Sequence, residues 1–180
     1  MKITPTALPG VLVIEPSVFS DDRGFFFESW NARALAESGI DAAFVQDNHS
    51  RSRRGVLRGL HYQVRRPQGK LVRTVVGEAY DVAVDLRRSS PAFGRAVGVT
   101  LSAENRKMLW VPPGFAHGFL ALTDTVDFLY KTTDYWHREH ERTLLWSDAA
   151  LGIDWPLEGE PILAAKDAAG TPLAQAETFD

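Results

Sequence analysis

The sequence contains no cysteine among its 180 residues. That absence excludes disulfide bonds, thiolate metal sites and cysteine nucleophiles, and it is typical of proteins from a reducing compartment. No apolar run approaches the roughly 18 residues that indicate a membrane-spanning helix. The N-terminus also lacks the apolar stretch of a secretory signal. These absences predict a cytoplasmic protein with no membrane partner.

Acidic residues are missing from one long segment, Asn48 to Gly77, which carries eight Lys and Arg residues. The whole chain has 20 basic and 23 acidic residues and a net charge of −3, so the remainder sums to −11, which is −3 minus 8. This overall balance argues against a globally basic nucleic-acid-binding protein. A basic segment within an acidic remainder indicates an anionic ligand for that segment.

Short apolar runs rich in Val, Phe, Tyr and Leu recur along the chain, and turn sequences such as Asp22–Gly24 and Pro67–Gly69 separate them. Many short strands at this spacing predict a mainly β fold, an antiparallel sandwich or barrel with a few short helices. The expected strands are Val11–Ile14, Gly24–Trp30, Phe44–Asn48, Val56–Gln63, Lys70–Val76, Ala79–Leu86, Ala96–Leu101, Lys107–Val111, Gly118–Leu122, Val126–Lys131 and Thr143–Trp146.

Helical signals are few. One helix is expected over Ala32–Ser38, with Asn31 as its N-cap and Gly39 as its C-terminal stop. A single helical turn is expected over Ala103–Asn105, and the proline-containing tail after Trp155 is expected to be irregular. The length and the absence of a linker or repeat predict one domain over residues 1–180.

Two segments place a histidine in an apolar context, Leu57–Gln63 with His61 and Val111–Phe119 with His117. The second segment resembles the second cupin motif, a Pro-x-Gly turn followed by a histidine on the next strand. The first cupin motif contains His-x-His, but here only His61 is present. Two histidines without a nearby carboxylate fall short of the usual three or four metal ligands, so no metal is expected.

His61 alone could be a general base, a metal ligand or a core residue. Arg58 lies three positions before it, so a regular strand would send the two side chains to opposite faces. Gly59 could allow a bulge that redirects one of them. A second histidine pair, His137 and His140, lies in a polar stretch and is interpreted as solvated loop.

Three consecutive phenylalanines, Phe25 to Phe27, place apolar groups on both faces of the expected strand. Such a strand is expected to be covered on both sides. Packing between subunits would account for that cover.

Taken in order, seven segments resemble the dTDP-4-dehydrorhamnose 3,5-epimerase family. They are Asp22–Glu28, Phe44–Ser50, Leu57–Gln63, Gln68–Arg73, Pro113–Phe119, Tyr130–Asp134 and Lys166–Asp167. The resemblance implies a cupin-type jelly roll that works as a homodimer, with neither metal nor cofactor. It also implies epimerisation at C3 and C5 of dTDP-4-dehydro-6-deoxy-D-glucose to dTDP-4-dehydro-L-rhamnose, in dTDP-L-rhamnose biosynthesis.

The same resemblance implies a role for each matching residue. His61 matches the general base, Asp167 its carboxylate partner and Tyr130 the acid on the opposite sugar face. Lys70 matches the cation beside the sugar oxygen, and Trp136 matches an aromatic residue that stacks on the thymine base. The other implied substrate-binding residues are Arg23, Phe25, Glu28, Gln46, Asn48, Arg58, His117 and Glu141, of which Arg23, Gln46, Asn48 and Arg58 match diphosphate contacts.

Other functions stay open at this point. The same fold could serve a 3- or 5-mono-epimerase, a ketoisomerase, or a metal-dependent or non-catalytic cupin. Nucleic-acid binding by the basic segment is disfavoured, because aromatic stacking motifs do not accompany its cations. Five arginines of that segment have no role in the epimerase scheme, namely Arg51, Arg53, Arg54, Arg65 and Arg66.

Overall fold

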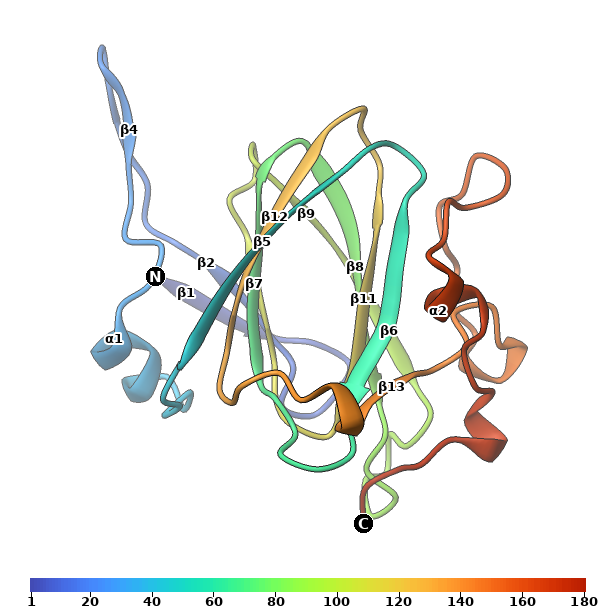
Figure 1. The fold of residues 1–180 in the computed structure, drawn as a ribbon. Coiled ribbons are helices and arrows are strands. Elements are labelled where there is room, and N and C mark those ends of the chain that lie inside the picture. Colours follow the sequence, from blue (N-terminus) through green and yellow to red (C-terminus); the bar gives the residue numbers. More distant parts are fainter.

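The computed structural model describes residues 1–180 and has two antiparallel β-sheets that face each other (Figure 1). The larger sheet has the strand order β1 (Lys2–Pro5), β2 (Leu12–Glu15), β10 (Met108–Val111), β7 (Lys70–Val76), β12 (Val126–Thr132) and β5 (Gln46–Ser52). The smaller sheet has the order β13 (Glu141–Thr143), β6 (Leu57–Gln63), β11 (Phe115–Ala121), β8 (Glu78–Asp85) and β9 (Ala96–Ser102). The predicted mainly β sandwich is therefore confirmed.

The main core lies between the two sheets. Val72 and Phe128 of the six-stranded sheet and Ala83 and Phe119 of the five-stranded sheet belong to one buried cluster. The alternating side chains of β8 send Val82 to a second cluster on the other face. Both faces of the five-stranded sheet are therefore covered.

The C-terminal part of the chain supplies the cover for the outer face of the five-stranded sheet, where Leu151 and Ala176 pack against that second cluster (Figure 1). The sequence predicts an irregular tail after Trp155, but the tail contains a short helix, α2 (Ala165–Ala168), and a 3-10 turn, η3 (Leu173–Gln175). Two more 3-10 turns precede it, η1 (Arg138–His140) and η2 (Ala149–Leu151).

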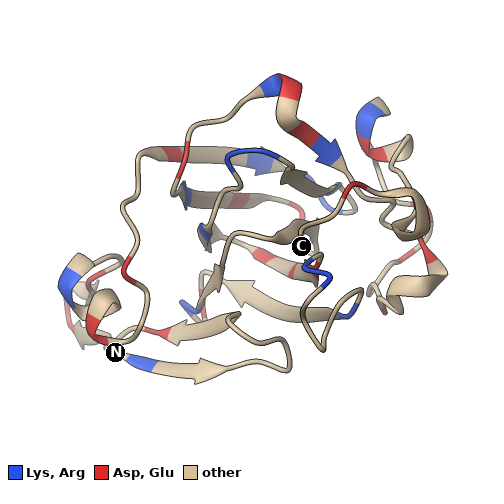
Figure 2. Ribbon diagram, turned by 90° about the horizontal axis from the view of Figure 1, so that it is seen from below, with Lys and Arg blue, Asp and Glu red and all other residues tan.

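Helix α1 (Ala32–Glu37) covers one end of the outer face of the six-stranded sheet, where Leu35 packs with Ile14 and Met108. Its predicted cap is confirmed, because the Asn31 side chain accepts a hydrogen bond from the Ala34 N–H at 3.1 Å. No helix of the structure is long and apolar enough to cross a membrane. Figure 2 shows basic and acidic positions interspersed over the ribbon.

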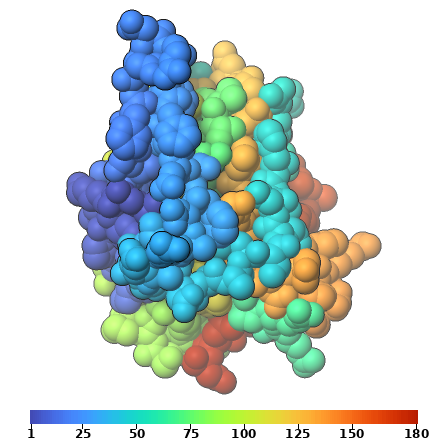
Figure 3. Space-filling model, turned by 90° about the vertical axis from the view of Figure 1, so that its left-hand side faces the viewer, coloured from blue at the N-terminus to red at the C-terminus, as the bar shows by residue number.

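A small hairpin, β3 (Phe19–Asp21) and β4 (Gly24–Phe26), projects from the body of the molecule (Figures 1 and 3). The exposed fractions of Phe19, Phe25 and Phe26 are 67%, 58% and 67%. One chain alone leaves this strand largely uncovered, so the cover expected on both faces stays a prediction about packing between subunits. Its only aromatic–cation contacts are on one side, where Arg106 lies 4.3 Å from the Phe25 ring and Arg73 lies 5.8 Å from the Phe27 ring.

Ala103–Asn105 forms the expected single helical turn, which the Arg106 N–H closes by donating to the Ser102 carbonyl at 3.0 Å. The side chains of Ser102 and Asn105 bind each other's backbone N–H at 2.9 and 3.0 Å, which caps this turn. The positions of two expected strands need correction. The strand expected at Thr143–Trp146 lies at β13, and the strand expected at Phe44–Asn48 lies at β5. Pairing with β6 and β12, which the local sequence does not reveal, sets these two registers.

Candidate active site

A cavity of about 430 Å³ lies between the sheets, and side chains from both sheets and from the C-terminal tail line it. Ten of the thirteen predicted site residues lie on its wall. They are Gln46, Asn48, Arg58, His61, Lys70, His117, Tyr130, Trp136, Glu141 and Asp167.

A bulge explains why Arg58 and His61 share this cavity. His117 of β11 pairs with His61, and Phe119 pairs with Arg58, so three steps along β6 match two steps along β11. The additional residue in β6 cancels the alternation that would separate the two side chains. Gly59 lies inside the bulge with φ of 128°, a conformation that favours glycine. The predicted role of Gly59 is therefore confirmed.

His61 forms a close pair with Asp167, at 2.5 Å from Nε2 to Oδ1. Asp167 is buried in α2, so the tail carries the carboxylate to a histidine 106 positions earlier in the chain. Burial lowers the pKa of His61, and the hydrogen bond and charge of Asp167 oppose that effect. The imidazole is thereby oriented and is neutral near pH 7.

Lys70 is a buried cation on the cavity wall, and its Nζ donates a hydrogen bond to the His61 carbonyl oxygen at 3.2 Å. Burial lowers the pKa of Lys70 to about 8. Tyr130 reaches the cavity from β12 of the opposite sheet, and burial raises the pKa of its hydroxyl, with the charge of Glu141 adding to the shift. His61 and Tyr130 therefore face the same space from two different sheets.

The mouth of the cavity carries Trp136, whose side chain is half exposed. The Trp136 backbone N–H donates to Gln46 Oε1 at 3.2 Å, and Gln46 Nε2 donates to Asn48 Oδ1 at 2.8 Å. Arg58 donates to the Ser52 hydroxyl at 3.0 Å and to the Arg51 carbonyl at 3.1 Å, which holds its guanidinium on the wall.

Sequence reasoning missed two partners in this site. Asp81 is fully buried and lies 2.8 Å from His117, from carboxylate Oδ1 to Nε2. Its signal was available, because a charged residue stands there in an alternating apolar strand. Lys166 binds the Glu141 carboxylate with both distances at 3.1 Å, and only the tertiary fold brings these two residues together.

Three predicted site residues, Arg23, Phe25 and Glu28, do not line the cavity. Arg23 and Phe25 lie on the projecting hairpin, where Arg23 pairs with Asp21 at 2.6 Å. Glu28 follows the hairpin and accepts from Asn31 at 3.2 Å. Within one chain their expected contact with substrate is therefore not formed.

The arginines without a role are also away from the cavity. Arg51 binds Asp127 with two contacts of 2.7 Å, Arg66 binds Asp134 at 2.8 and 3.0 Å, and Arg54 binds Asp124 at 2.9 Å. Arg53 and Arg65 are exposed.

The prediction that His137 and His140 are solvated loop residues is wrong in part. His137 and His140 are partly buried, and their ring nitrogens lie 3.7 and 3.9 Å from a Glu139 carboxylate oxygen. No three His, Asp or Glu side chains come close enough together to hold a metal ion.

Known proteins resemble the whole chain. The model of the dTDP-4-dehydrorhamnose 3,5-epimerase family matches residues 5–175. A dTDP-4-dehydrorhamnose 3,5-epimerase from Pseudomonas aeruginosa is 60% identical over 180 residues, which cover 99% of both chains. The crystal structure of a Legionella pneumophila dTDP-6-deoxy-D-glucose-3,5-epimerase in complex with dTDP-4-keto-L-rhamnose has a TM-score of 0.95 and 51% identity, covering 97% of this chain and 93% of that one.

A more distant structure is that of a 3'-monoepimerase from Streptomyces bikiniensis in complex with dTDP-quinovose. Its TM-score is 0.91 at 34% identity, and the alignment covers 96% of this chain and 88% of that one. The fold alone therefore does not separate double from single epimerases. The family is assigned by the match of the family model to residues 5–175 and by the 60% identity. By these comparisons, the chain belongs to the dTDP-4-dehydrorhamnose 3,5-epimerase family.

Proposed function

We propose that this isomerase epimerises C3 and C5 of dTDP-4-dehydro-6-deoxy-D-glucose to give dTDP-4-dehydro-L-rhamnose, with His61 as base and Tyr130 as acid. The hydrogens at C3 and C5 are both α to the C4 carbonyl, so removal of either one produces an enolate. Epimerisation then requires that a proton return from the opposite face.

The observation that carries this proposal is the position of His61 and Tyr130 on opposite sheets around one cavity. A base and an acid on the same side would only restore the starting configuration. The raised pKa of Tyr130 keeps its hydroxyl protonated and able to donate near pH 7.

Asp167 and Lys70 support the two charges that develop in the reaction. Asp167 binds His61 Nε2, which leaves Nδ1 to take the proton, and its carboxylate stabilises the resulting imidazolium. Lys70 is the cation available to the enolate oxygen. Loss of one such preorganised donor typically costs about 2.7–4 kcal/mol in transition-state stabilisation.

The nucleotide part of the substrate explains the rest of the wall. The guanidinium of Arg58 suits a diphosphate oxygen, and Trp136 at the mouth suits a stacked thymine base. Asn48 Nδ2 and Ser50 Oγ are buried on the same wall without a partner, so two polar atoms are free for a ligand.

A second copy of the chain completes the proposed enzyme. The exposed phenylalanines of the hairpin form an apolar surface that one chain leaves uncovered. A homodimer in which this hairpin crosses to its partner would cover that surface. It would also offer Arg23, Phe25 and Glu28 to the partner's cavity, the substrate contact that is absent within one chain.

The test is exchange of solvent deuterium into dTDP-4-dehydro-6-deoxy-D-glucose, followed by NMR. We expect deuterium at both C3 and C5 of the product, and we expect His61→Asn to reduce the exchange rate by about 100- to 10,000-fold. Label at only one centre would indicate a mono-epimerase. Full activity in His61→Asn would refute the assignment of the base.

Tyr130→Phe separates the two proton transfers. This variant keeps the base, so exchange can continue by return of a proton to the same face, whereas inversion should fall by at least about 100-fold. A ratio of exchange to inversion equal to that of the unmodified protein would contradict the acid role of Tyr130.

A further inference from the structure

The loop of residues 133–137 carries Trp136 to the mouth of the cavity, and three side chains hold this loop without lining the cavity. We infer that Gln63, Arg66 and Asp134 are positioning residues that set the indole of Trp136 for the nucleotide base. We name these three residues the loop clamp. The inference rests on the proposed function, because it takes the ligand of Trp136 to be a nucleotide.

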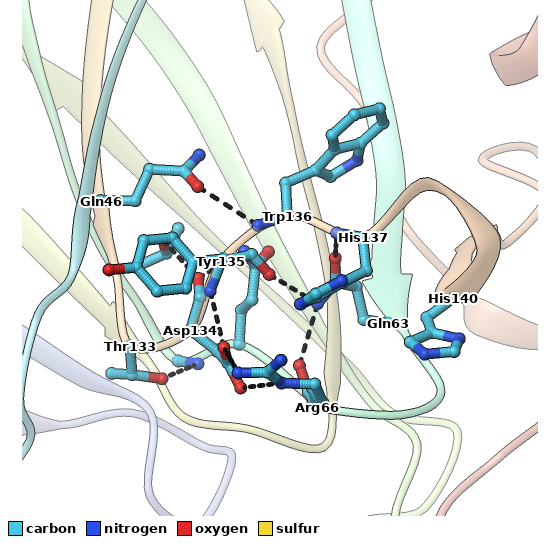
Figure 4. A network of polar contacts seen from close by, with 12 residues as sticks. Gln46, Gln63, Arg66, Thr133, Asp134, Tyr135, Trp136, His137 and His140 are labelled. Atoms are coloured by element: carbon cyan, nitrogen blue, oxygen red, sulfur yellow. Dashed lines mark hydrogen bonds and ion pairs between the residues drawn. The ribbon is translucent and has the colours of Figure 1, made fainter.

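Gln63 is the buried centre of the clamp. Its Oε1 accepts from the His137 N–H at 2.6 Å, and its Nε2 donates to the carbonyls of Arg66 at 2.9 Å and Tyr135 at 3.3 Å. One amide therefore binds the backbone on both sides of Trp136 and ties it to the β6–β7 turn (Figure 4).

The ion pair of Arg66 and Asp134 closes the other side of the loop. Arg66 Nε and Nη2 bind the two carboxylate oxygens at 3.0 and 2.8 Å. The Asp134 carbonyl accepts further bonds from the side chains of Gln68 and Thr132, at 2.8 and 2.9 Å. Arg66 itself has φ of 52°, which residues other than glycine rarely adopt, so its backbone is held by these contacts and not by local preference.

The indole depends on this backbone anchoring because little else holds it. Trp136 is 52% exposed, and Figure 4 shows its ring projecting away from the ion pair. Its hydrogen bond to Gln46 is made by its backbone N–H and not by its ring. A loop anchored at both sides limits the orientations of a side chain that packing does not restrain, which lowers the entropy lost on binding.

The predicted effect is therefore on binding and not on proton transfer. Gln63→Leu and Arg66→Met should weaken dTDP binding, measured by calorimetry, by at least about 5-fold, since a stacked base contributes about that factor or more. The value of kcat at saturating nucleotide sugar should stay within about 2-fold of the unmodified protein, because neither residue touches the cavity. Arg65→Met is the matched control, because Arg65 is the exposed neighbour with no side-chain hydrogen bond or ion pair, and it should bind dTDP normally.

A double-mutant cycle with Trp136→Ala tests whether the clamp acts through the indole. Arg66→Met should add less than about 2-fold to the loss of dTDP affinity already caused by Trp136→Ala. Additive losses, or a fall in kcat with unchanged dTDP affinity, would overturn the inference. Melting curves show whether Gln63→Leu is folded. If it is unfolded, the dTDP affinity of the surface variant Arg66→Met decides whether the clamp inference holds.

Failure of the loop clamp can be distinguished from failure of the proposed function. If the unmodified protein shows no deuterium exchange and no affinity for dTDP, the proposed function fails. If it exchanges deuterium and binds dTDP, and both clamp variants bind dTDP equally well, only the clamp fails.

Discussion

Burial gives His61 and Lys70 complementary charge states at neutral pH. Desolvation lowers the pKa of both residues, which favours a neutral imidazole and brings the ammonium of Lys70 close to its titration range. The base acts when it is neutral, above its pKa, whereas the cation acts when it is charged, below its pKa. The enzyme should therefore be active in the pH interval between the pKa of His61 and the pKa of Lys70.

This interval predicts a bell-shaped pH profile of kcat/KM, which reports the groups of the free enzyme. The acidic limb should have its midpoint below the ordinary histidine value of about 6.5, and the alkaline limb should lie near 8, the pKa of Lys70. Tyr130 is not expected to set the alkaline limb, since its pKa is raised.

Lys70→Arg is the matched variant for this profile. A guanidinium stays charged across the range, so the alkaline limb should move up by more than one pH unit even if the maximum falls about 10-fold. An alkaline limb that stays near 8 in Lys70→Arg would show that another group causes it. Rates of deuterium exchange measured from pH 5 to 10 provide the comparison.

At the scale of elements, the close pairing of β6 with β11 positions the site. Gly59 and Gly118 allow the two backbones to approach closely at the bulge that directs both Arg58 and His61 to the cavity. A Cβ at position 118 would lie 2.5 Å from the Arg58 carbonyl oxygen and 3.0 Å from Gly59 Cα. Backbone atoms cannot move aside as a flexible side chain would, so this approach requires glycine.

Gly118→Ala should therefore separate the strands and displace the proposed base. We expect a loss of about 1–3 kcal/mol in the free energy of unfolding, from overpacking, and a fall of at least about 10-fold in kcat/KM. Denaturant unfolding and the exchange assay measure the two effects. Normal activity and stability in Gly118→Ala would show that the close approach of β6 and β11 tolerates a side chain.

At the scale of the whole molecule, the two sheets differ in how they are covered. The tail covers the outer face of the five-stranded sheet, whereas α1 covers only the end of the six-stranded sheet near β2 and β10. Figure 3, viewed from that side of the molecule, shows the N-terminal hairpin in front of the body. A partner chain would account for two observations together. It would cover the exposed phenylalanines of the hairpin, and it would place Arg23, Phe25 and Glu28 at a cavity.

Phe26→Glu tests this arrangement. A charge at an apolar interface is costly to bury, so the variant should shift a dimer toward monomer in sedimentation and reduce kcat/KM by at least about 10-fold. Ile162→Glu is the control, because Ile162 is also exposed but lies on the tail away from the hairpin. A monomeric unmodified protein would exclude the proposed dimer. A fully active monomeric variant would show that the partner's hairpin contributes nothing to the cavity.

Local sequence predicted most of the strands, though not β1 and β3, together with the capped helix α1 and a bulge that Gly59 could allow, because alternation, capping and φ preferences act over a few residues. The ordered motifs also determined the family. The tertiary structure alone decided which distant groups meet, such as His61 with Asp167, His117 with Asp81 and Glu141 with Lys166.

These pairs depend on strand pairing and on the path of the tail, and no local pattern encodes either. The same reason explains the registers of β5 and β13 and the exposure of the Phe25–Phe27 segment, because each depends on what the rest of the chain does or does not place beside it. The acid-free segment Asn48 to Gly77 predicts an anionic ligand. Folding divides it into cavity residues such as Arg58 and Lys70 and arginines that pair with carboxylates elsewhere.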